Sequence, residues 1–437
     1  MEQTCIELAK ALSETTIARR RDFHKHPETA WTEFRTAALI ADVLTDLGYE
    51  VQVGAEVVNE AAMMGVPSSE ELERCRQRAL AEGAKEQWVA KMTGGKTGVV
   101  GTLSFAKPGP TVALRFDMDA NDLSEVAELD HRPYAEGFAS IHQGAMHGCG
   151  HDGHSAIGLA VAEILKSLAS QLAGQVKLIF QPGEEGVRGA KSMVAAGVVD
   201  FVDSILGMHL GVSLTKLGQL SYKTDGFFAT TKIDALFQGK AAHAGGAPEQ
   251  GANALVAAAT ALLNLQALSR HSQGDSRVNV GVLSGGSGRN VIPDQAFLAL
   301  EVRGETSEVN QFMKERVLHI LEGAAMMQGV TVEHKEMGSA AGCRNDEALA
   351  RQVETAAVAT GLFDEVTAAN AGGGSEDFTY FMEGVQAHGG QAVYTMVGTE
   401  LAAPHHNGRF DFNEAALWRA AAFLSTTVCQ LLQSEKQ

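Results

Sequence analysis

A thiol and three imidazoles fall within eight residues of the segment Met146–His154. The glycines between them let the backbone turn tightly, so Cys149 and His151, two residues apart, can point in the same direction. A thiolate combined with an imidazole is a donor set that zinc and neighbouring transition metals select. We therefore predict that Cys149 and His151 bind a metal ion. His147 and His154 are expected to orient these ligands or to cap the helix that follows.

Three apolar segments are typical of buried strands, and each carries polar residues at or just beyond its end. They are 111–116, followed by Asp117 and Asp119; 176–180, followed by Glu184 and Glu185; and 204–209, with His209 near its end. Open α/β sheets place their sites at the carboxyl ends of strands, so these side chains are expected to serve the metal-binding segment. The two aspartates would either bind metal or orient a ligating imidazole.

Glu184 and Glu185 are adjacent, and adjacent side chains of an extended segment point to opposite sides. One carboxylate can then bind metal while the other takes a proton from a water molecule, which is the arrangement that metal-assisted hydrolysis needs. The alternative is a solvated acidic turn. The position directly after an apolar strand favours the functional interpretation.

The elements expected around this segment follow from hydrophobic periodicity. They are helices over 5–26, 29–47 and 413–432, a helix directly after His154, and strands over 49–53 and 393–398. His24 and His26 end the first helix without glycine support. We expect them to be solvated, substrate-facing or capping residues rather than ligands.

Residues 55–95 interrupt this regular pattern. Ser68 and Glu71 fit a capping box that begins a charged helix. The polar composition predicts an exposed excursion, which is either an insertion without chemistry or a flap that shapes the substrate site.

A different pattern begins near residue 225. Its order of elements is strand 231–237, helix 252–268, strands 278–283 and 296–303, helix 307–328 and strand 330–335. This βαββαβ order is that of the ferredoxin-like sandwich. It predicts a small domain over 225–336, inserted into an α/β domain formed by 1–224 and 337–437. Three polar residues stand out in it: His243, Asn290 and Arg303.

Composition excludes several classes of function. The chain has 437 residues with a formal net charge of -18, which argues against nucleic acid or an anionic membrane surface as a partner. Five scattered cysteines do not describe a disulfide framework and fit a reducing compartment. No apolar run approaches the roughly 20 residues of a membrane span, and no signal-peptide pattern is present, so we expect a cytoplasmic protein.

Six motifs carry a resemblance to a known family. In order they are Asp117-Met118-Asp119-Ala120, His147-Gly148-Cys149-Gly150-His151-Asp152-Gly153-His154, Gln181-Pro182-Gly183-Glu184-Glu185-Gly186, Ala241-Ala242-His243, Gly288-Arg289-Asn290-Val291-Ile292-Pro293 and Ser375-Glu376-Asp377. Over nearly its whole length the chain resembles the metal-dependent aminoacylase/carboxypeptidase superfamily, in the branch that hydrolyses N-acyl amino acids. The resemblance implies an amidohydrolase that cleaves p-aminobenzoyl-glutamate to p-aminobenzoate and glutamate. The alternatives are a broader hydrolase of hippurate-like substrates and a subunit that needs a homologous partner chain.

The resemblance also implies two divalent metal ions, manganese or zinc. The matching ligands are Cys149, His151, Glu185, His209 and one of His405 and His406. We choose His406, because the family places its ligand directly before Asn or Ser and a few residues ahead of Phe, as in His406-Asn407-Gly408-Arg409-Phe410. Glu184 matches the general base. Arg115-Phe116-Asp117 stands where the wider superfamily has His-x-Asp, so Asp117 is expected to orient a ligand rather than to bind metal.

The resemblance implies a two-domain protein, in which a mixed-sheet α/β metallohydrolase domain carries an inserted ferredoxin-like lid. That lid would mediate dimerisation, with a second copy or with a homologous subunit. His243 would reach into the neighbouring subunit's site and stabilise the oxyanion. Asn290 and Arg303 match substrate-contacting positions, and Arg303 would suit a carboxylate because its guanidinium can bind both oxygens.

Overall fold

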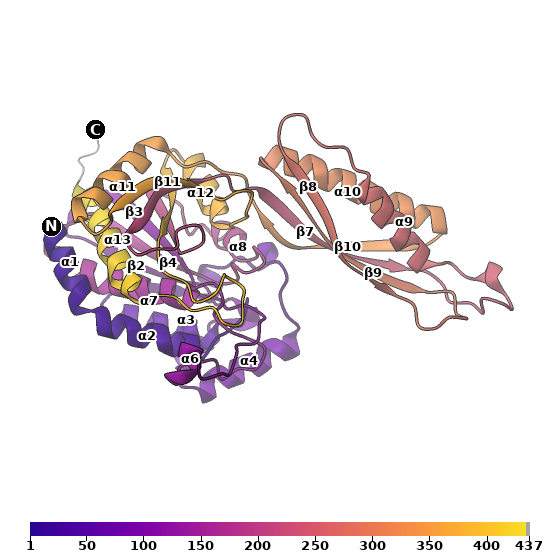
Figure 1. Cartoon of the computed structure of the whole chain (residues 1–437), viewed down its shortest axis with the longest axis horizontal. Helices are drawn as coiled ribbons and strands as arrows, with labels where there is room; N and C mark the ends of the chain where they lie inside the picture. The colour runs from indigo at the N-terminus through magenta and orange to yellow at the C-terminus, as the bar shows by residue number, and fades with distance from the viewer. Residues whose placement is uncertain (434–437) are drawn as a thin grey trace. The chain divides into compact units, whose positions relative to one another are not determined.

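The computed structural model describes residues 1–433, which divide into two compact units (Figure 1). The first unit comprises Met1–Asp225, Arg344–Ala371 and Asp377–Gln437, and the second comprises Gly226–Cys343 and Gly372–Glu376. The second unit continues past residue 336 because its last strand, β10, runs over Thr331–Ala340.

The first unit is built on a mixed eight-stranded sheet. Its strands lie in the order β1 (Glu50–Val53), β2 (Val99–Ser104), β4 (Ala173–Gln181), β3 (Lys107–Asp117), β5 (Ser204–Leu210), β12 (Gln391–Val397), β6 (Gln219–Asp225) and β11 (Glu365–Asn370). The four central strands β4, β3, β5 and β12 are parallel, whereas β1, β2 and β6 join the sheet through antiparallel pairs. Each strand predicted in this unit is confirmed, because long apolar runs of β-branched and aromatic residues favour fully buried strands.

Helices cover this sheet. They are α1 (Glu2–Ala11), α2 (Ser13–Lys25), α3 (Phe34–Asp46), α4 (Ser69–Ala81), α5 (Glu86–Val89), α6 (Arg132–Ala135), α7 (His151–Ser167), α8 (Ala190–Val194), α11 (Glu347–Thr360), α12 (Phe378–Ala387) and α13 (Ala415–Gln433). Short 3-10 helices η1 to η4 lie at Gly54–Glu56, Glu60–Ala62, Thr93–Gly95 and Ala169–Gln171. The helix predicted over 5–26 is divided at Leu12, and the helix predicted from residue 29 begins only at Phe34.

Within residues 1–433, α13 is the one helix long and apolar enough to cross a membrane, but 78% of its apolar window is buried. It packs against α1, α7 and α11, and its buried residues belong to the hydrophobic core of the first unit. α13 is therefore a core helix.

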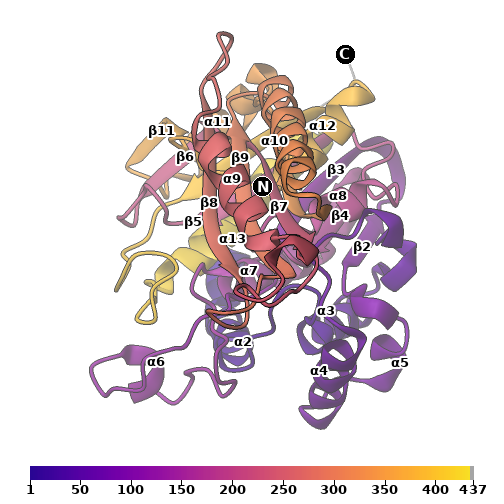
Figure 2. The ribbon, with the colours of Figure 1, turned by 90° about the vertical axis from the view of Figure 1, so that its right-hand side faces the viewer.

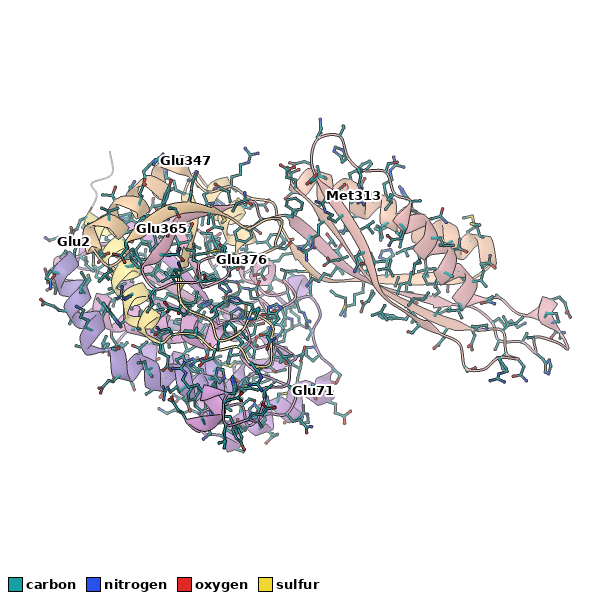
Figure 3. All side chains as sticks on the ribbon, in the orientation of Figure 1. Glu2, Glu71, Met313, Glu347, Glu365 and Glu376 are labelled. Carbon is teal, nitrogen blue, oxygen red and sulfur yellow. The ribbon has the colours of Figure 1, made fainter. Side chains whose placement is uncertain are left out.

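The excursion over residues 55–95 is exposed on one face only. The Ser68 hydroxyl accepts the Glu71 amide at 3.2 Å, so Ser68 caps α4 as predicted (Glu71 is labelled in Figure 3). The Glu71 carboxylate binds Arg74 and Cys75 instead of completing the predicted capping box. Leu72, Cys75 and Trp88 are buried, and α4 and α5 pack against α3. The excursion is therefore amphipathic, with charged residues on its exposed face and apolar residues packed against α3.

The second unit has the predicted strand and helix order. It contains β7 (Ala229–Gln238), η5 (Pro248–Gln250), α9 (Ala254–Gln266), β8 (Ser276–Gly285), β9 (Gln295–Gly304), α10 (Ser307–Gln328) and β10. The strands form an antiparallel sheet in the order β10-β7-β9-β8, and α9 and α10 lie side by side on one face of it (Figure 2). Met313 of α10, labelled in Figure 3, is fully buried in the core between these helices and the sheet.

Candidate metal centre

The candidate site lies at the carboxyl ends of the four parallel strands of the first unit. β3 ends at Asp117, β4 ends two residues before Gly183, β5 carries His209 as its second-last residue, and β12 leads to the loop with His405 and His406. α7 begins at His151 above the same edge. Segments far apart in the sequence therefore deliver their polar residues to one place, as open α/β sheets do.

The loop before α7 is fixed by its backbone. Gly150 has a φ of 92°, in the left-handed region that a side chain disfavours, which lets Cys149 and His151 approach one another. The Gly148 amide donates to the side-chain oxygen of Asn121 at 2.9 Å, and the Gly148 carbonyl accepts the His406 amide at 2.8 Å. The two histidine-bearing loops are thus joined directly.

Two imidazoles are oriented by backbone carbonyls. Nδ1 of His151 donates to the Asp119 carbonyl at 2.9 Å, and Nδ1 of His209 donates to the Leu210 carbonyl at 2.8 Å. Because a carbonyl can only accept, both rings carry a proton on Nδ1, which leaves Nε2 as the nitrogen that can bind a metal ion. This is the usual arrangement behind metal-ligating histidines.

The donor atoms form two groups that share the thiol. One ligand atom each from Cys149, His151 and His209 lies within 4.8 Å of the others, and so do atoms from Cys149, Glu185 and His406. Sγ of Cys149 is 3.4 Å from Nε2 of His209, and Nε2 of His406 is 3.2 Å from Oε1 of Glu185. The five side chains predicted as ligands are therefore brought together, with Cys149 between the two groups.

Glu184 lies beside this set. One carboxylate oxygen of Glu184 is 4.0 Å from Nε2 of His151, and His151, Glu184 and Glu185 form a further group of close donor atoms. The side chain of Glu184 is partly exposed, whereas that of His151 is buried. Glu184 thus stands where it can address a water molecule next to the donors.

The electrostatics of the cluster fit a divalent cation. Burial raises the pKa of the Cys149 thiol well above its usual value, and the charge of Glu185 raises it further. Burial also holds the pKa of His209 well below its usual value. Nε2 of His151 is buried without a hydrogen bond of normal geometry to any residue of the described chain. A bound cation would offset the cost of burying the Cys149 thiolate and would accept the Nε2 lone pairs of His151 and His209. The residues therefore fit a metal site.

The other two histidines near the donor atoms, His154 and His405, form hydrogen bonds within the protein. Nδ1 of His154 is 2.5 Å from Asp117, and its Nε2 accepts the Leu210 amide at 3.0 Å. Nε2 of His405 donates to the Leu210 carbonyl at 3.2 Å, which leaves His406 as the residue facing Glu185. Asp117 is also paired with Arg115 at 2.6 Å. These contacts support an orienting role for His154 and Asp117.

His406 adopts a φ of 60°, which is unusual for a residue with a side chain. Strained backbone of this kind costs on the order of 1–3 kcal/mol and concentrates at functional sites. The hydrogen bond from the His406 amide to the Gly148 carbonyl and the side-chain contact with Glu185 hold His406 in place.

Two sets of supporting residues contain members that were not predicted. Arg20 is fully buried and binds Asp152 at 2.7 Å, Asp411 at 2.9 Å and Glu414 at 3.2 Å. His24 is also fully buried, at 2.8 Å from Asp152, so the expectation of a solvated, substrate-facing or capping residue was wrong for it. The signal in the sequence was the spacing of Thr16, Arg20 and His24, which puts one polar stripe on a single face of α2.

The second set holds the turn that carries Glu184 and Glu185. Oδ1 of Asp119 accepts the Glu184 amide at 3.0 Å, and its Oδ2 accepts the Glu185 amide at 2.9 Å. Glu33, at the start of α3, accepts the Gly183 amide at 2.8 Å. Asp119 was predicted as a metal ligand or an orienting residue, and its contacts are those of an orienting residue.

In the second unit, His243 and Asn290 lie in adjoining loops. The Ala244 amide donates to the Asn290 carbonyl at 3.0 Å, and both side chains belong to exposed residues. Arg303 lies near the other end of β9, where it pairs with Glu301 at 3.0 Å and donates to the Gly373 carbonyl at 3.2 Å. The three residues singled out in this unit therefore do not form one cluster.

The profile of Peptidase family M20/M25/M40 matches residues 113–430, which include every residue of the candidate centre. The chain belongs to this family. It is 50% identical over 409 residues to a subunit of p-aminobenzoyl-glutamate hydrolase from Escherichia coli (strain K12), covering 93% of this chain and 94% of that protein. It is 48% identical to indole-3-acetyl-aspartic acid hydrolase of Enterobacter agglomerans, with the same coverage.

Solved structures of the family agree with this assignment. The aminobenzoyl-glutamate utilization protein from Klebsiella pneumoniae superposes with a TM-score of 0.84 at 41% identity, covering 98% of each chain. A Bacillus subtilis protein described as a dinuclear metal binding peptidase from the M20 family has a TM-score of 0.68 at 26% identity, covering 98% of this chain and 100% of that one. This M20 chain is accordingly a metal-dependent amidohydrolase, and its cofactors are divalent metal ions.

Proposed function

We propose that this M20 enzyme hydrolyses p-aminobenzoyl-glutamate to p-aminobenzoate and glutamate. The observation that carries the proposal is the convergence of a thiol, three imidazoles and two adjacent carboxylates at one sheet edge. The substrate is supported by the relative of 50% identity and by the solved structure of 41% identity, whose names both contain aminobenzoyl-glutamate.

Two divalent ions, manganese or zinc, are the proposed cofactors. Cys149, His151 and His209 would hold one ion, and Glu185 and His406 would hold the other, with Cys149 within reach of both. When bound, the ions would lower the pKa of the attacking water and polarise the scissile carbonyl. Soft thiolate and imidazole donors suit zinc, whereas carboxylates also suit manganese.

Glu184 is the proposed general base. Its backbone amide is fixed by Asp119 at 3.0 Å, while its carboxylate extends toward the donor cluster. It would take a proton from the attacking water and pass that proton to the leaving nitrogen of glutamate.

The second unit, Gly226–Cys343 with Gly372–Glu376, is proposed to be a ferredoxin-like lid and dimerisation domain. Through it two copies, or this chain and a homologous subunit, would associate. Nδ1 of His243 accepts the amides of Gly245 at 3.2 Å and Gly246 at 2.9 Å, so the ring proton is on Nε2. The Nε2–H of this exposed imidazole is a suitable donor to the oxyanion in the partner's site.

Asn290 and Arg303 are proposed to contact the substrate, Arg303 through a carboxylate. The five free cysteines, four of them buried, support a reducing, cytoplasmic location. Nucleic acid and membrane are not proposed as partners.

A second candidate substrate class follows from the relative of 48% identity, which is named for indole-3-acetyl-aspartic acid. Both names describe an aromatic acyl group joined to an acidic amino acid. Purified chain supplied with manganese or zinc should show a higher kcat/KM for p-aminobenzoyl-glutamate than for indole-3-acetyl-aspartate or hippurate. A preference for hippurate would overturn the proposed substrate. Hydrolysis that begins only after a homologous chain is added would show that this chain is one subunit of a larger enzyme and is not active alone.

A further inference from the structure

The turn that carries Glu184 and Glu185 has an unusual support beneath it. Three consecutive amides, those of Gly183, Glu184 and Glu185, donate to two buried carboxylates. Glu33 receives the first amide at 2.8 Å and Asp119 receives the other two. The turn is therefore held by its backbone and leaves both glutamate side chains to the site.

Glu33 joins this turn to Thr97, just beyond the excursion. Its Oε1 accepts the Gly183 amide, and its Oε2 accepts the hydroxyl of Thr97 at 2.6 Å. The side chain is fully buried, and both oxygens are used. Burial, with the charge of Asp119, raises the pKa of Glu33 well above its usual value, so a neutral side chain of the same shape is compatible with the position.

The excursion also contacts the segment that follows this turn, at two points. A guanidinium nitrogen of Arg188 donates to the Gly65 carbonyl at 3.2 Å, and the Asn59 amide donates to the Ser192 carbonyl at 3.0 Å. The Arg188 side chain passes over Gly186, where an added Cβ would lie 2.6 Å from Nε. The segment after the turn is thus hydrogen-bonded to the excursion at Arg188 and at Ser192.

We infer that Glu33 is a positioning residue, which, with Thr97 just beyond the excursion, sets the place of the Glu184 carboxylate through the Gly183 amide. The excursion over 55–95 is then a brace for the base-bearing turn rather than an insertion without a role. The inference rests on the proposed role of Glu184. A displacement of about 1 Å at a catalytic group can cost about a hundredfold in rate.

The chain supplies a matched control. Glu28 is also a buried carboxylate that accepts two amides, those of Arg35 at 2.9 Å and Thr36 at 2.8 Å, but it does not touch the turn. Glu33 and Glu28 therefore differ in what they hold and not in the kind of bond they make.

The test compares Glu33→Ala, Glu33→Asp, Glu33→Gln and Glu28→Ala at saturating metal. Glu33→Ala and Glu33→Asp should lower kcat about ten- to a hundredfold with KM within about twofold, because the shortened side chains do not reach the Gly183 amide. Glu33→Gln should keep most of the wild-type kcat, since its amide oxygen can still accept. Glu33→Asp keeps the test decisive if Glu33→Ala does not fold.

Hydrogen exchange supplies a readout that does not depend on turnover. The amides of 183–185 should exchange faster in Glu33→Ala and at the wild-type rate in Glu28→Ala. Wild-type kcat in Glu33→Asp, or an equal loss of kcat in Glu28→Ala, would overturn the inference. Absence of p-aminobenzoyl-glutamate hydrolysis by the wild type would refute the proposed substrate alone. The role of Glu33 would still be decided by the exchange rates and by the ratio of variant to wild-type kcat on any substrate that the enzyme hydrolyses.

Discussion

The turn with Glu184 and the loop with His243 are held in different ways. The turn donates its amides to the carboxylates of Asp119, just beyond the end of β3, and Glu33, just before α3. The imidazole of His243 instead accepts two amides of its own loop, those of Gly245 and Gly246, and the loop pairs with the neighbouring loop at Asn290 and Val291. Metal ligands and the base beside them need a geometry accurate to about 0.5 Å, and buried partners from several elements supply it. A donor that acts from an exposed loop can be placed by a movement of its domain or by a partner chain.

The first prediction tests the better-held region. Glu184→Ala should lower kcat about 10²–10⁴-fold, because proton transfer to and from the substrate is lost. Metal content, measured by atomic emission on the purified protein, should stay at the wild-type level, since Glu184 is not a proposed ligand. Glu185→Ala is the matched control and should lose metal. Loss of metal in Glu184→Ala instead would mean that the base and the ligand are exchanged.

The second prediction tests the loop. His243→Ala should lower kcat about 10²–10³-fold, the cost of removing one oxyanion donor. When Glu184→Ala and His243→Ala chains are mixed and allowed to re-form dimers, a mixed dimer has one site with both residues intact. Half of the dimers would be mixed, so about a quarter of the sites should recover.

This recovery is the sharpest measure of the difference between the two regions. A mixture as inactive as its components would show that His243 acts within its own chain. Ala244→Gly, next to His243, is a suitable control because it leaves the imidazole in place.

Much of this contrast could be predicted from the sequence, and the part that could not has a physical cause. Strand ends were predictable because an apolar run followed by Asp117, Glu184 or His209 has few other interpretations. Glu33 and Arg20 were not, since a buried charge looks like a surface charge until its partners are known. Arg20 stands between Arg19 and Arg21, and its partners Asp152 and Asp411 are more than a hundred residues away.

The third prediction concerns the charges beneath the site. Arg20→Met should lower the free energy of unfolding by about 3–5 kcal/mol, because Asp152, Asp411 and Glu414 would lose a fully buried partner. Arg277→Met in the second unit breaks an exposed pair with Asp275, whose side chains are 57% and 66% exposed, and should cost less than about 1 kcal/mol. Urea titrations followed by circular dichroism measure both. An equal loss in the free energy of unfolding for the two variants would show that the buried ion pairs of Arg20 stabilise the fold no more than the exposed pair of Arg277.

The smallest expected effect is on the acid limb of stability. Burial alone would raise the pKa values of Asp411 and Glu414. Arg132 and Arg20 hold the pKa of Asp411 below its usual value, and Arg21, Arg20 and Arg132 hold that of Glu414 below its usual value. A depressed pKa in the folded state means that the unfolded chain binds protons first as the pH falls. The stabilisation is therefore complete above about pH 4.5, near the ordinary carboxyl pKa values, and is lost as the pH falls further.

Glu414→Gln should flatten this dependence, because an amide neither titrates nor attracts the three arginines as a carboxylate does. Thermal unfolding between pH 7 and pH 3 should show a Tm that falls less steeply with acid in Glu414→Gln than in the wild type, from a lower starting value at pH 7. Glu249→Gln, at an exposed position of the second unit, should leave the slope unchanged. If Glu414→Gln keeps the wild-type slope of Tm against pH, the acid sensitivity arises at other carboxylates. The ion pairs of Arg20 with Asp411 and Glu414 would then not distinguish the first unit from the second.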